Sequence, residues 1–169
     1  PTEADAKAVL AELGAAPDAT GVMRLSFVGA AAPRLDSLGT VQGSVEPDLA
    51  ALRGRVVVLE FWAAWCSVCR FLVPTLNELH GRYSAQGVVV LGITMDAVVP
   101  ATHAVTALGI EYPIASDHSG KTASAYQANA LPTIFVIDPK GVVRDVLVGY
   151  SPDGLLRIER LVRDLTAAR

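Results

Sequence analysis

Two cysteines separated by two residues, Cys66 and Cys69, are the side chains most able to do chemistry in this chain of 169 residues. They are its only cysteines. Their spacing allows a small disulfide ring, which opens and closes by thiol–disulfide exchange. We therefore expect a redox site, with Cys66 as the exposed, attacking sulfur and Cys69 as the resolving one.

Other uses of such a pair fit the sequence less well. A structural zinc site takes four ligands, but there is no second cysteine pair, and His80, His103 and His118 are scattered without ligand spacing. A purely structural disulfide would remove little entropy from the unfolded chain, because its loop is so short. Two buried thiols without a role remain an alternative interpretation. We expect neither a metal nor another cofactor.

The segments on either side of the cysteines indicate a strand followed by a helix. The apolar run Val56–Leu59 is typical of a buried strand. After the cysteines, apolar residues recur at spacings of three and four, as on one face of a helix. These residues are Val68, Leu72, Leu76, Leu79 and Tyr83. Cys66 would then lie at a helix N-terminus, where N–H groups and the helix dipole favour its thiolate.

The residues around the cysteines also resemble a known family. The segment Arg53–Cys69, which ends in Glu-Phe-Trp-Ala-Ala-Trp-Cys-Ser-Val-Cys, is similar to the active-site segment of the thioredoxin superfamily. Within it, the sequence resembles the TlpA/ResA-like (CcmG-like) branch of extracytoplasmic thiol–disulfide oxidoreductases. The resemblance continues through Pro74, Leu131–Asp138 and Gly141, and covers roughly residues 29–165.

This resemblance implies an α/β, thioredoxin-like fold with a central mixed sheet flanked by helices. The domain would span residues 29–169, after an N-terminal extension (1–28) with a short helix and a strand. A strand and a helix would be inserted before a cis-proline. The expected helices cover residues 2–14, 100–108, 119–128 and a last segment capped by Ser151, with a helical turn at 47–54. The expected strands cover 22–28, 88–94, 112–115, 134–137 and 142–148, with an irregular hairpin at 37–45.

Glu60 is an acidic residue in an otherwise apolar strand, six positions before Cys66. Burial there should raise its pKa, and carboxylates are rarely buried without a partner. Thioredoxin has an aspartate at this position that exchanges a proton with the resolving cysteine. Many ResA-like proteins instead have a glutamate three residues after the second cysteine, where this chain has Leu72. We hypothesise that Glu60 is the general base toward Cys69; the alternative is a structural acid paired with solvent.

The resemblance implies a substrate-contacting surface around the disulfide. Pro132 would be the cis-proline that lies against the cysteines, although a proline is also tolerated at the start of any strand. It adds no N–H donor beside the thiolate, and the turn would expose the Leu131 backbone for pairing with an extended substrate peptide. Trp65 would form an apolar wall beside the disulfide. Ser67 and Val68, between the cysteines, complete the expected contact set and leave the reduction potential open.

Composition argues against several other classes of protein. The charge is slightly acidic, with 14 Lys and Arg against 17 Asp and Glu, and no basic cluster indicates nucleic-acid binding. No apolar run approaches the ~18 residues of a membrane span. The resemblance places the protein outside the cytoplasm, periplasmic or anchored by a segment that this chain does not contain. We expect a monomer.

The sequence therefore predicts a thiol–disulfide oxidoreductase that acts on protein disulfides or thiols, as a reductase in cytochrome c maturation or on copper chaperones. A membrane-embedded thiol donor would re-reduce it, as the resemblance implies. One alternative is that the same site acts as a disulfide oxidase or isomerase. Another is a copper-handling protein that uses Cys66 and Cys69 as soft ligands. A peroxidase is less well supported, since no Pro-x-x-x-Thr-x-x-Cys pattern surrounds either cysteine.

Overall fold

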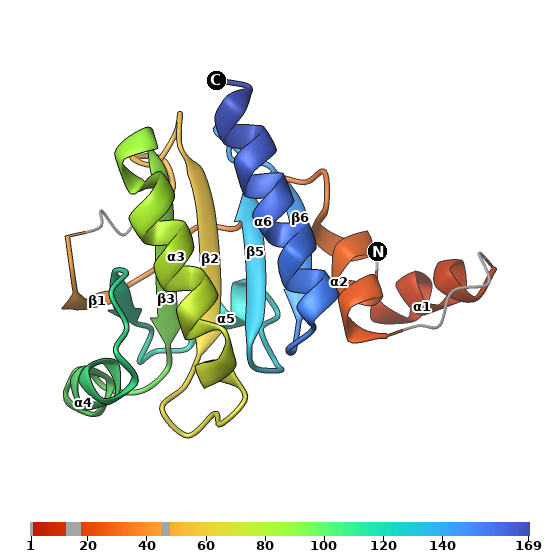
Figure 1. Cartoon of the computed structure of the whole chain (residues 1–169). Helices are drawn as coiled ribbons and strands as arrows, with labels where there is room; N and C mark the ends of the chain where they lie inside the picture. The colour runs from red at the N-terminus through yellow and green to blue at the C-terminus, as the bar shows by residue number, and fades with distance from the viewer. Residues whose placement is uncertain (1, 13–17, 45–47) are drawn as a thin grey trace.

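The computed structural model describes residues 2–12, 18–44 and 48–169. A six-stranded sheet with the order β1-β4-β3-β2-β5-β6 lies at its centre (Figure 1). The strands are β1 (Gly39–Gln42), β2 (Val56–Trp62), β3 (Val88–Thr94), β4 (Ile114–Ser116), β5 (Thr133–Ile137) and β6 (Val143–Val148). The β2–β3 and β3–β4 pairs are parallel, whereas β1–β4, β2–β5 and β5–β6 are antiparallel. The expected mixed sheet is confirmed.

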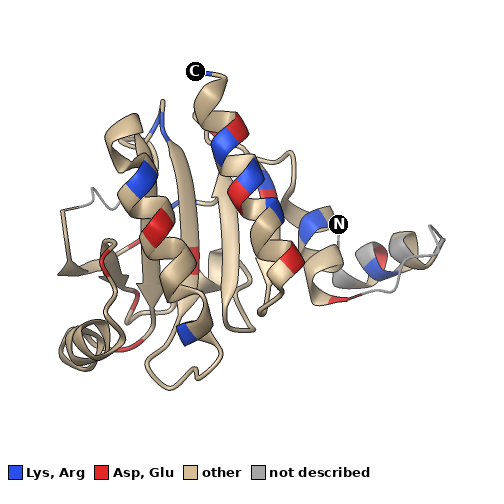
Figure 2. Cartoon of the chain, in the orientation of Figure 1, with Lys and Arg blue, Asp and Glu red and all other residues tan. Residues whose placement is uncertain are grey.

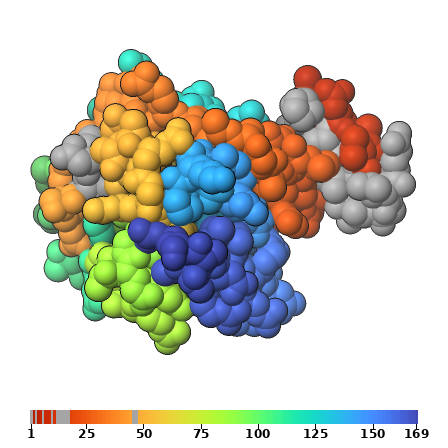
Figure 3. Space-filling model, turned by 90° about the horizontal axis from the view of Figure 1, so that it is seen from above, coloured from red at the N-terminus to blue at the C-terminus, as the bar shows by residue number. Residues whose placement is uncertain are grey.

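Helices cover both faces of this sheet. They are α1 (Glu3–Glu12), α2 (Ala19–Phe27), α3 (Val73–Tyr83), α4 (Val98–Leu108), α5 (Lys121–Ala125) and α6 (Pro152–Ala167), with 3-10 turns η1 (Cys69–Phe71) and η2 (Ser84–Gln86). In Figure 1, α3 and α6 lie in front of the sheet and α5 lies behind it. In Figure 3, α1 lies at the outer end of the molecule, on the side of α2, which it contacts. The division at residue 28 stays a prediction.

The two central strands are buried along their whole length. Since successive side chains of a strand point to opposite faces, β2 supplies two separate apolar layers. Val56, Val58 and Trp62 pack in the layer that contains both cysteines and residues of α3 and α6. Val57, Leu59 and Phe61 pack in the layer that contains residues of α2 and α5. Residue 60 therefore lies on the same face of the sheet as the cysteines.

Several expected elements are confirmed at or near their predicted bounds. The strand at 88–94 matches β3, and the helix ending at Leu108 is followed by Gly109 in the left-handed conformation (φ 65°). That helix begins at Val98, two residues earlier than expected. The hairpin of β5 and β6 forms as expected. Ser151 caps α6 by accepting a hydrogen bond from the Gly154 N–H at 3.1 Å.

Three expected elements differ from the structure, in their type, their number of strands or their length. The segment expected as a strand at 22–28 is α2, capped by Asp18, whose carboxylate accepts from the Gly21 N–H at 2.6 Å. Its buried residues, Val22, Met23 and Phe27, have helical spacing. The expected hairpin at 37–45 is instead the single strand β1, which pairs with β4. The expected helix at 119–128 is limited to α5.

Parts of three expected elements lie outside the described residues. They are the end of the helix at 2–14, the last residue of the hairpin at 37–45 and the start of the turn at 47–54. The rest of the 47–54 segment forms successive helical turns. At the N-terminus, the Thr2 hydroxyl accepts from the Asp5 N–H at 3.2 Å, the hydrogen bond that an N-cap side chain makes.

Candidate active site at the Cys66–Cys69 disulfide

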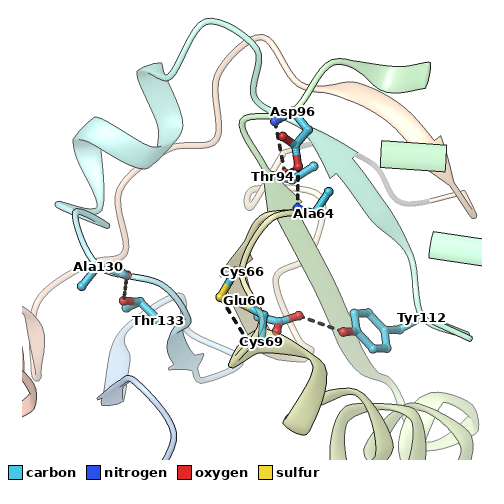
Figure 4. Close-up of a disulfide and its surroundings, with 9 residues drawn as sticks. All are labelled: Glu60, Ala64, Cys66, Cys69, Thr94, Asp96, Tyr112, Ala130 and Thr133. Atoms are coloured by element: carbon cyan, nitrogen blue, oxygen red, sulfur yellow. Dashed lines mark hydrogen bonds between the residues drawn. A yellow bond between two sulfur atoms is a disulfide. The ribbon is translucent and has the colours of Figure 1, made fainter. Parts of the chain in front are cut away.

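Cys66 and Cys69 form a disulfide in the loop that follows β2, with their Cα atoms 5.4 Å apart. Cys66 is 9% exposed and Cys69 is 2% exposed. The Cys69 backbone N–H points to the Cys66 sulfur at 3.2 Å (Figure 4). A donor at this position would stabilise a thiolate on Cys66 once the disulfide is reduced. Cys66 is the more exposed of the two, and the expected order, in which Cys66 attacks and Cys69 resolves, stays a prediction.

The expected helix does not begin at Cys66. Residues Cys69–Phe71 form a 3-10 turn, and the α-helix α3 begins only at Val73. Pro74 lies in its first turn, where the missing N–H costs nothing because first-turn N–H groups have no partner within the helix. The dipole of a helix acts only near its first turn, and Cys66 lies seven residues before α3 begins. The group that favours a Cys66 thiolate is therefore the Cys69 N–H and not the dipole of α3.

Asp96 fixes the turn that precedes the cysteines. Its carboxylate accepts from the Ala64 N–H at 2.7 Å and from the Thr94 hydroxyl at 2.9 Å (Figure 4). Asp96 follows β3, and the carboxyl ends of parallel strands β2 and β3 lie at the same edge of the sheet. Asp96 was not expected from the sequence to contribute to the site. An acid two residues after a buried strand that neighbours β2 was the available signal.

Glu60 is 1% exposed and accepts a hydrogen bond on Oε2 from the Tyr112 hydroxyl at 2.8 Å (Figure 4). Burial raises the pKa of Glu60 to about 7, and the Tyr112 hydrogen bond opposes this increase. Burial, followed by the nearby Glu60 carboxyl, raises the pKa of Tyr112 well above its usual range. The expected rise in the Glu60 pKa is therefore found. Its partner is a buried phenol rather than solvent, and its role as a base stays a prediction.

The residues expected to contact a substrate differ in exposure. The Leu131–Pro132 peptide bond is cis, as the resemblance implied. Trp65 is 74% exposed and Val68 is 40% exposed. Ser67 is also exposed, whereas Leu131 is half-buried. Their contact with a substrate stays a prediction.

An open groove of about 360 Å³ brings two of these residues together. Its lining residues are Trp65, Met95, Gly120, Ala123, Ser124, Ala128, Asn129 and Leu131. Ser67 and Val68 are not among them. Met95 is 49% exposed and was not singled out from the sequence. The groove therefore joins the Trp65 side of the site to the loop that precedes Pro132.

Exposed aromatic side chains and the exposed Arg70 follow the second cysteine or pack beside it. Figure 2 shows both signs of charge along α6 and a loop between β2 and α3 that is largely uncharged. Phe71 and Tyr150 are 58% and 45% exposed, and their ring centroids lie 5.6 Å apart.

Within the described ranges, no group of three or more His, Cys, Asp and Glu residues could hold a metal ion. No helix in the same ranges is long and apolar enough to span a membrane.

Comparisons with known proteins show the family of this chain. The model of the AhpC/TSA family matches residues 28–146. The chain is 33% identical to thiol–disulfide oxidoreductase ResA of Geobacillus kaustophilus over 123 residues, which are 72% of this chain and 70% of that protein. It is 33% identical to ResA of Bacillus thuringiensis over 103 residues, which are 60% of each chain, so the match spans less than two thirds of that relative.

A solved structure supports the same assignment. A Chlorobium tepidum protein described as thiol:disulfide interchange protein DsbE superposes with a TM-score of 0.69 and is 28% identical. The match covers 81% of this chain and 98% of that one. The predicted thioredoxin-like fold and the resemblance to the TlpA/ResA-like branch are confirmed.

Proposed function

Because this chain belongs to the AhpC/TSA family, as a TlpA/ResA-like member of the thioredoxin superfamily, we propose that it is a thiol–disulfide oxidoreductase acting on protein substrates. The observation that carries the proposal is the disulfide itself. It lies in the segment after β2, directly after the exposed Trp65, and its two cysteines differ in exposure.

In the reducing direction, the Cys66 thiolate attacks one sulfur of a substrate disulfide. A mixed disulfide forms, the substrate S–S bond breaks, and the leaving sulfur takes up a proton. Cys69 then gives its proton to the Glu60 carboxylate and attacks the Cys66 sulfur. The second substrate thiol leaves with a proton, so the substrate gains two electrons and the Cys66–Cys69 pair loses two.

The proposed setting follows the ResA and DsbE names of the relatives. We propose a monomer outside the cytoplasm that a membrane-embedded thiol donor re-reduces. Its substrates would be the cysteines of apocytochrome c or of a copper chaperone. The reaction between Cys66 and a substrate sulfur is the same whichever of these proteins provides it.

Turnover of a protein disulfide tests the activity. The wild type should accelerate the reduction of insulin by dithiothreitol, whereas Cys66→Ser should not. Cys69→Ser should accumulate a mixed disulfide, visible as a larger species without reductant, because the resolving sulfur is missing. Equal activity of wild type and Cys66→Ser would rule out the proposal.

The reduction potential of the pair decides the direction. We expect a value near or below the about −270 mV of thioredoxin, which suits a reductase. A value near the about −120 mV of strong oxidants would instead favour disulfide delivery. A copper-handling protein would instead bind Cu(I) tightly in its reduced form and lose this binding in Cys66→Ser. Such a protein would not accelerate insulin reduction.

A further inference from the structure

Tyr112 is a fully buried tyrosine in the segment between α4 and β4, far from the cysteines in sequence. Its ring packs in the same apolar layer as Cys66 and Cys69. Its hydroxyl donates to Glu60 Oε2 at 2.8 Å, across 52 positions of sequence (Figure 4). This contact joins the inserted segment before Pro132 to the acid beside the redox site.

The strand between Tyr112 and Glu60 leaves room for this contact. Glu60 on β2 is paired in register with Gly92 on β3. A Cβ atom at Gly92 would lie 3.2 Å from Tyr112 Cε2 and 3.0 Å from Trp62 Nε1. Glycine inside a strand often marks such a close approach. The absence of a side chain at position 92 therefore allows the phenol to cross β3.

Among the described residues, none brings a second charge to Glu60. The residues paired with it on the two neighbouring strands are Gly92 and Ile134. Burial and the Tyr112 hydroxyl are the two influences on its pKa. The groups that could titrate in front of it are Cys66 and Cys69, which are joined in the disulfide. Tyr112 itself keeps its proton where Glu60 titrates, because its pKa lies well above the usual range.

We infer that Tyr112 is a positioning residue that holds the Glu60 carboxyl by Oε2 and leaves Oε1 to exchange a proton with Cys69. This inference rests on the proposed role of Glu60. Because Tyr112 stays protonated, its hydroxyl donates to the Glu60 carboxylate and stabilises that charged form. The carboxylate is the form of Glu60 that can act as a base. Tyr112 therefore sets the pH range in which Cys69 resolves a mixed disulfide.

The test separates the two sulfurs by their reaction with dithiobis(nitrobenzoate). Attack by Cys66 on this reagent releases one coloured thiolate, and resolution by Cys69 releases the second. Tyr112→Phe removes only the hydroxyl. It should move the midpoint of the second phase upward by about one pH unit, since it removes a hydrogen bond to a charged acceptor. The first phase should not change.

The matched control is Tyr126→Phe. Tyr126 is also buried, and its hydroxyl donates to the Pro33 carbonyl at 2.7 Å, but its ring packs on the opposite face of the sheet. This variant should lose comparable stability and keep the wild-type profile of the second phase. A shift of equal size in Tyr126→Phe would overturn the inference, because the effect would then reflect general loosening of the core.

Glu60→Gln distinguishes failure of the inference from failure of the proposed role. If Glu60→Gln leaves the second phase unchanged, Glu60 is not the base and the inference fails with it. If Glu60→Gln removes the inflection but Tyr112→Phe matches wild type, only the inference fails. If Tyr112→Phe does not fold, uniform 3-fluorotyrosine labelling replaces it. The stronger phenol donor should then lower the midpoint, and an unchanged midpoint would contradict the inference.

Discussion

The carboxylate of Asp96 accepts a hydrogen bond from the backbone N–H of Ala64 at 2.7 Å, which ties the end of β3 to the turn that carries the cysteines. The Asp96 carbonyl also accepts from the Ser116 hydroxyl at 2.6 Å, on β4. Three neighbouring segments thus meet at one residue. The position of Cys66 depends on this connection, because Cys66 lies only two residues after Ala64.

We expect Asp96→Ala to lower stability by about 1–2 kcal/mol, because the Ala64 N–H loses its charged acceptor. It should also change the reduction potential, since the turn before Cys66 is no longer fixed. Urea unfolding and glutathione equilibration measure the two effects. Asp48→Ala is the control: Asp48 accepts from the Ala50 N–H at 2.9 Å, in the turn before the other end of β2. An unchanged potential in Asp96→Ala would contradict the prediction.

Glu60 should make stability depend on pH. Its pKa rises from 4.5 to about 7 in the folded state, so the folded protein binds more protons than the unfolded chain between these values. Stability should therefore fall as pH rises through this window and level off above it. The full effect is on the order of 3 kcal/mol, from about 1.4 kcal/mol per unit.

Glu60→Gln isolates this contribution, because other titrating groups are common to both proteins. The free energy of unfolding of wild type minus that of Glu60→Gln, both oxidised, should decrease between pH 4.5 and 7. Urea unfolding at several pH values across the window measures it. A difference that does not vary with pH would show that Glu60 has an ordinary pKa.

Asp145 should stabilise the packing of α2 and α6 on β6. This residue is 2% exposed and pairs with Arg24 at 2.9 Å and with Arg157 at 2.6 Å. We expect Asp145→Asn to cost about 2–3 kcal/mol, below the usual loss for breaking a buried pair, since both arginines are partly exposed and regain water. Asp164→Asn is the control, because its pair with Arg163 is exposed and should contribute less than about 1 kcal/mol. Equal losses in urea unfolding would refute this.

Trp65 should contribute to binding of protein substrates. Its indole is 74% exposed and lines the groove beside the disulfide. Trp65→Ala should therefore raise the KM for insulin severalfold, because a large apolar contact is lost. Its reaction with a small disulfide reagent should change little. Val99→Ala, at a position 65% exposed on α4, is the control, and a similar KM in both variants would argue against a binding role.

Sequence alone determined the parts of this protein that depend on local pattern. The runs that became β2 and β3, the β5–β6 hairpin and the Ser151 cap were all predictable, because burial on both faces and capping leave a signature within a few residues. The cysteine pair was predictable because its spacing is visible within four consecutive residues. Glu60 was recognisable because a charge within an apolar run conflicts with its surroundings.

Tertiary structure decided which distant residues meet. The partner of Glu60 is Tyr112, 52 positions away, and the partner of the Ala64 N–H is Asp96, 32 positions away. The pairing of β1 with β4 is equally non-local, and α2 is a helix because Asp18 caps it and one face packs on the sheet. Periodicity within a segment reports which face is buried but not what lies against it. These contacts therefore appear only once the strands are placed side by side.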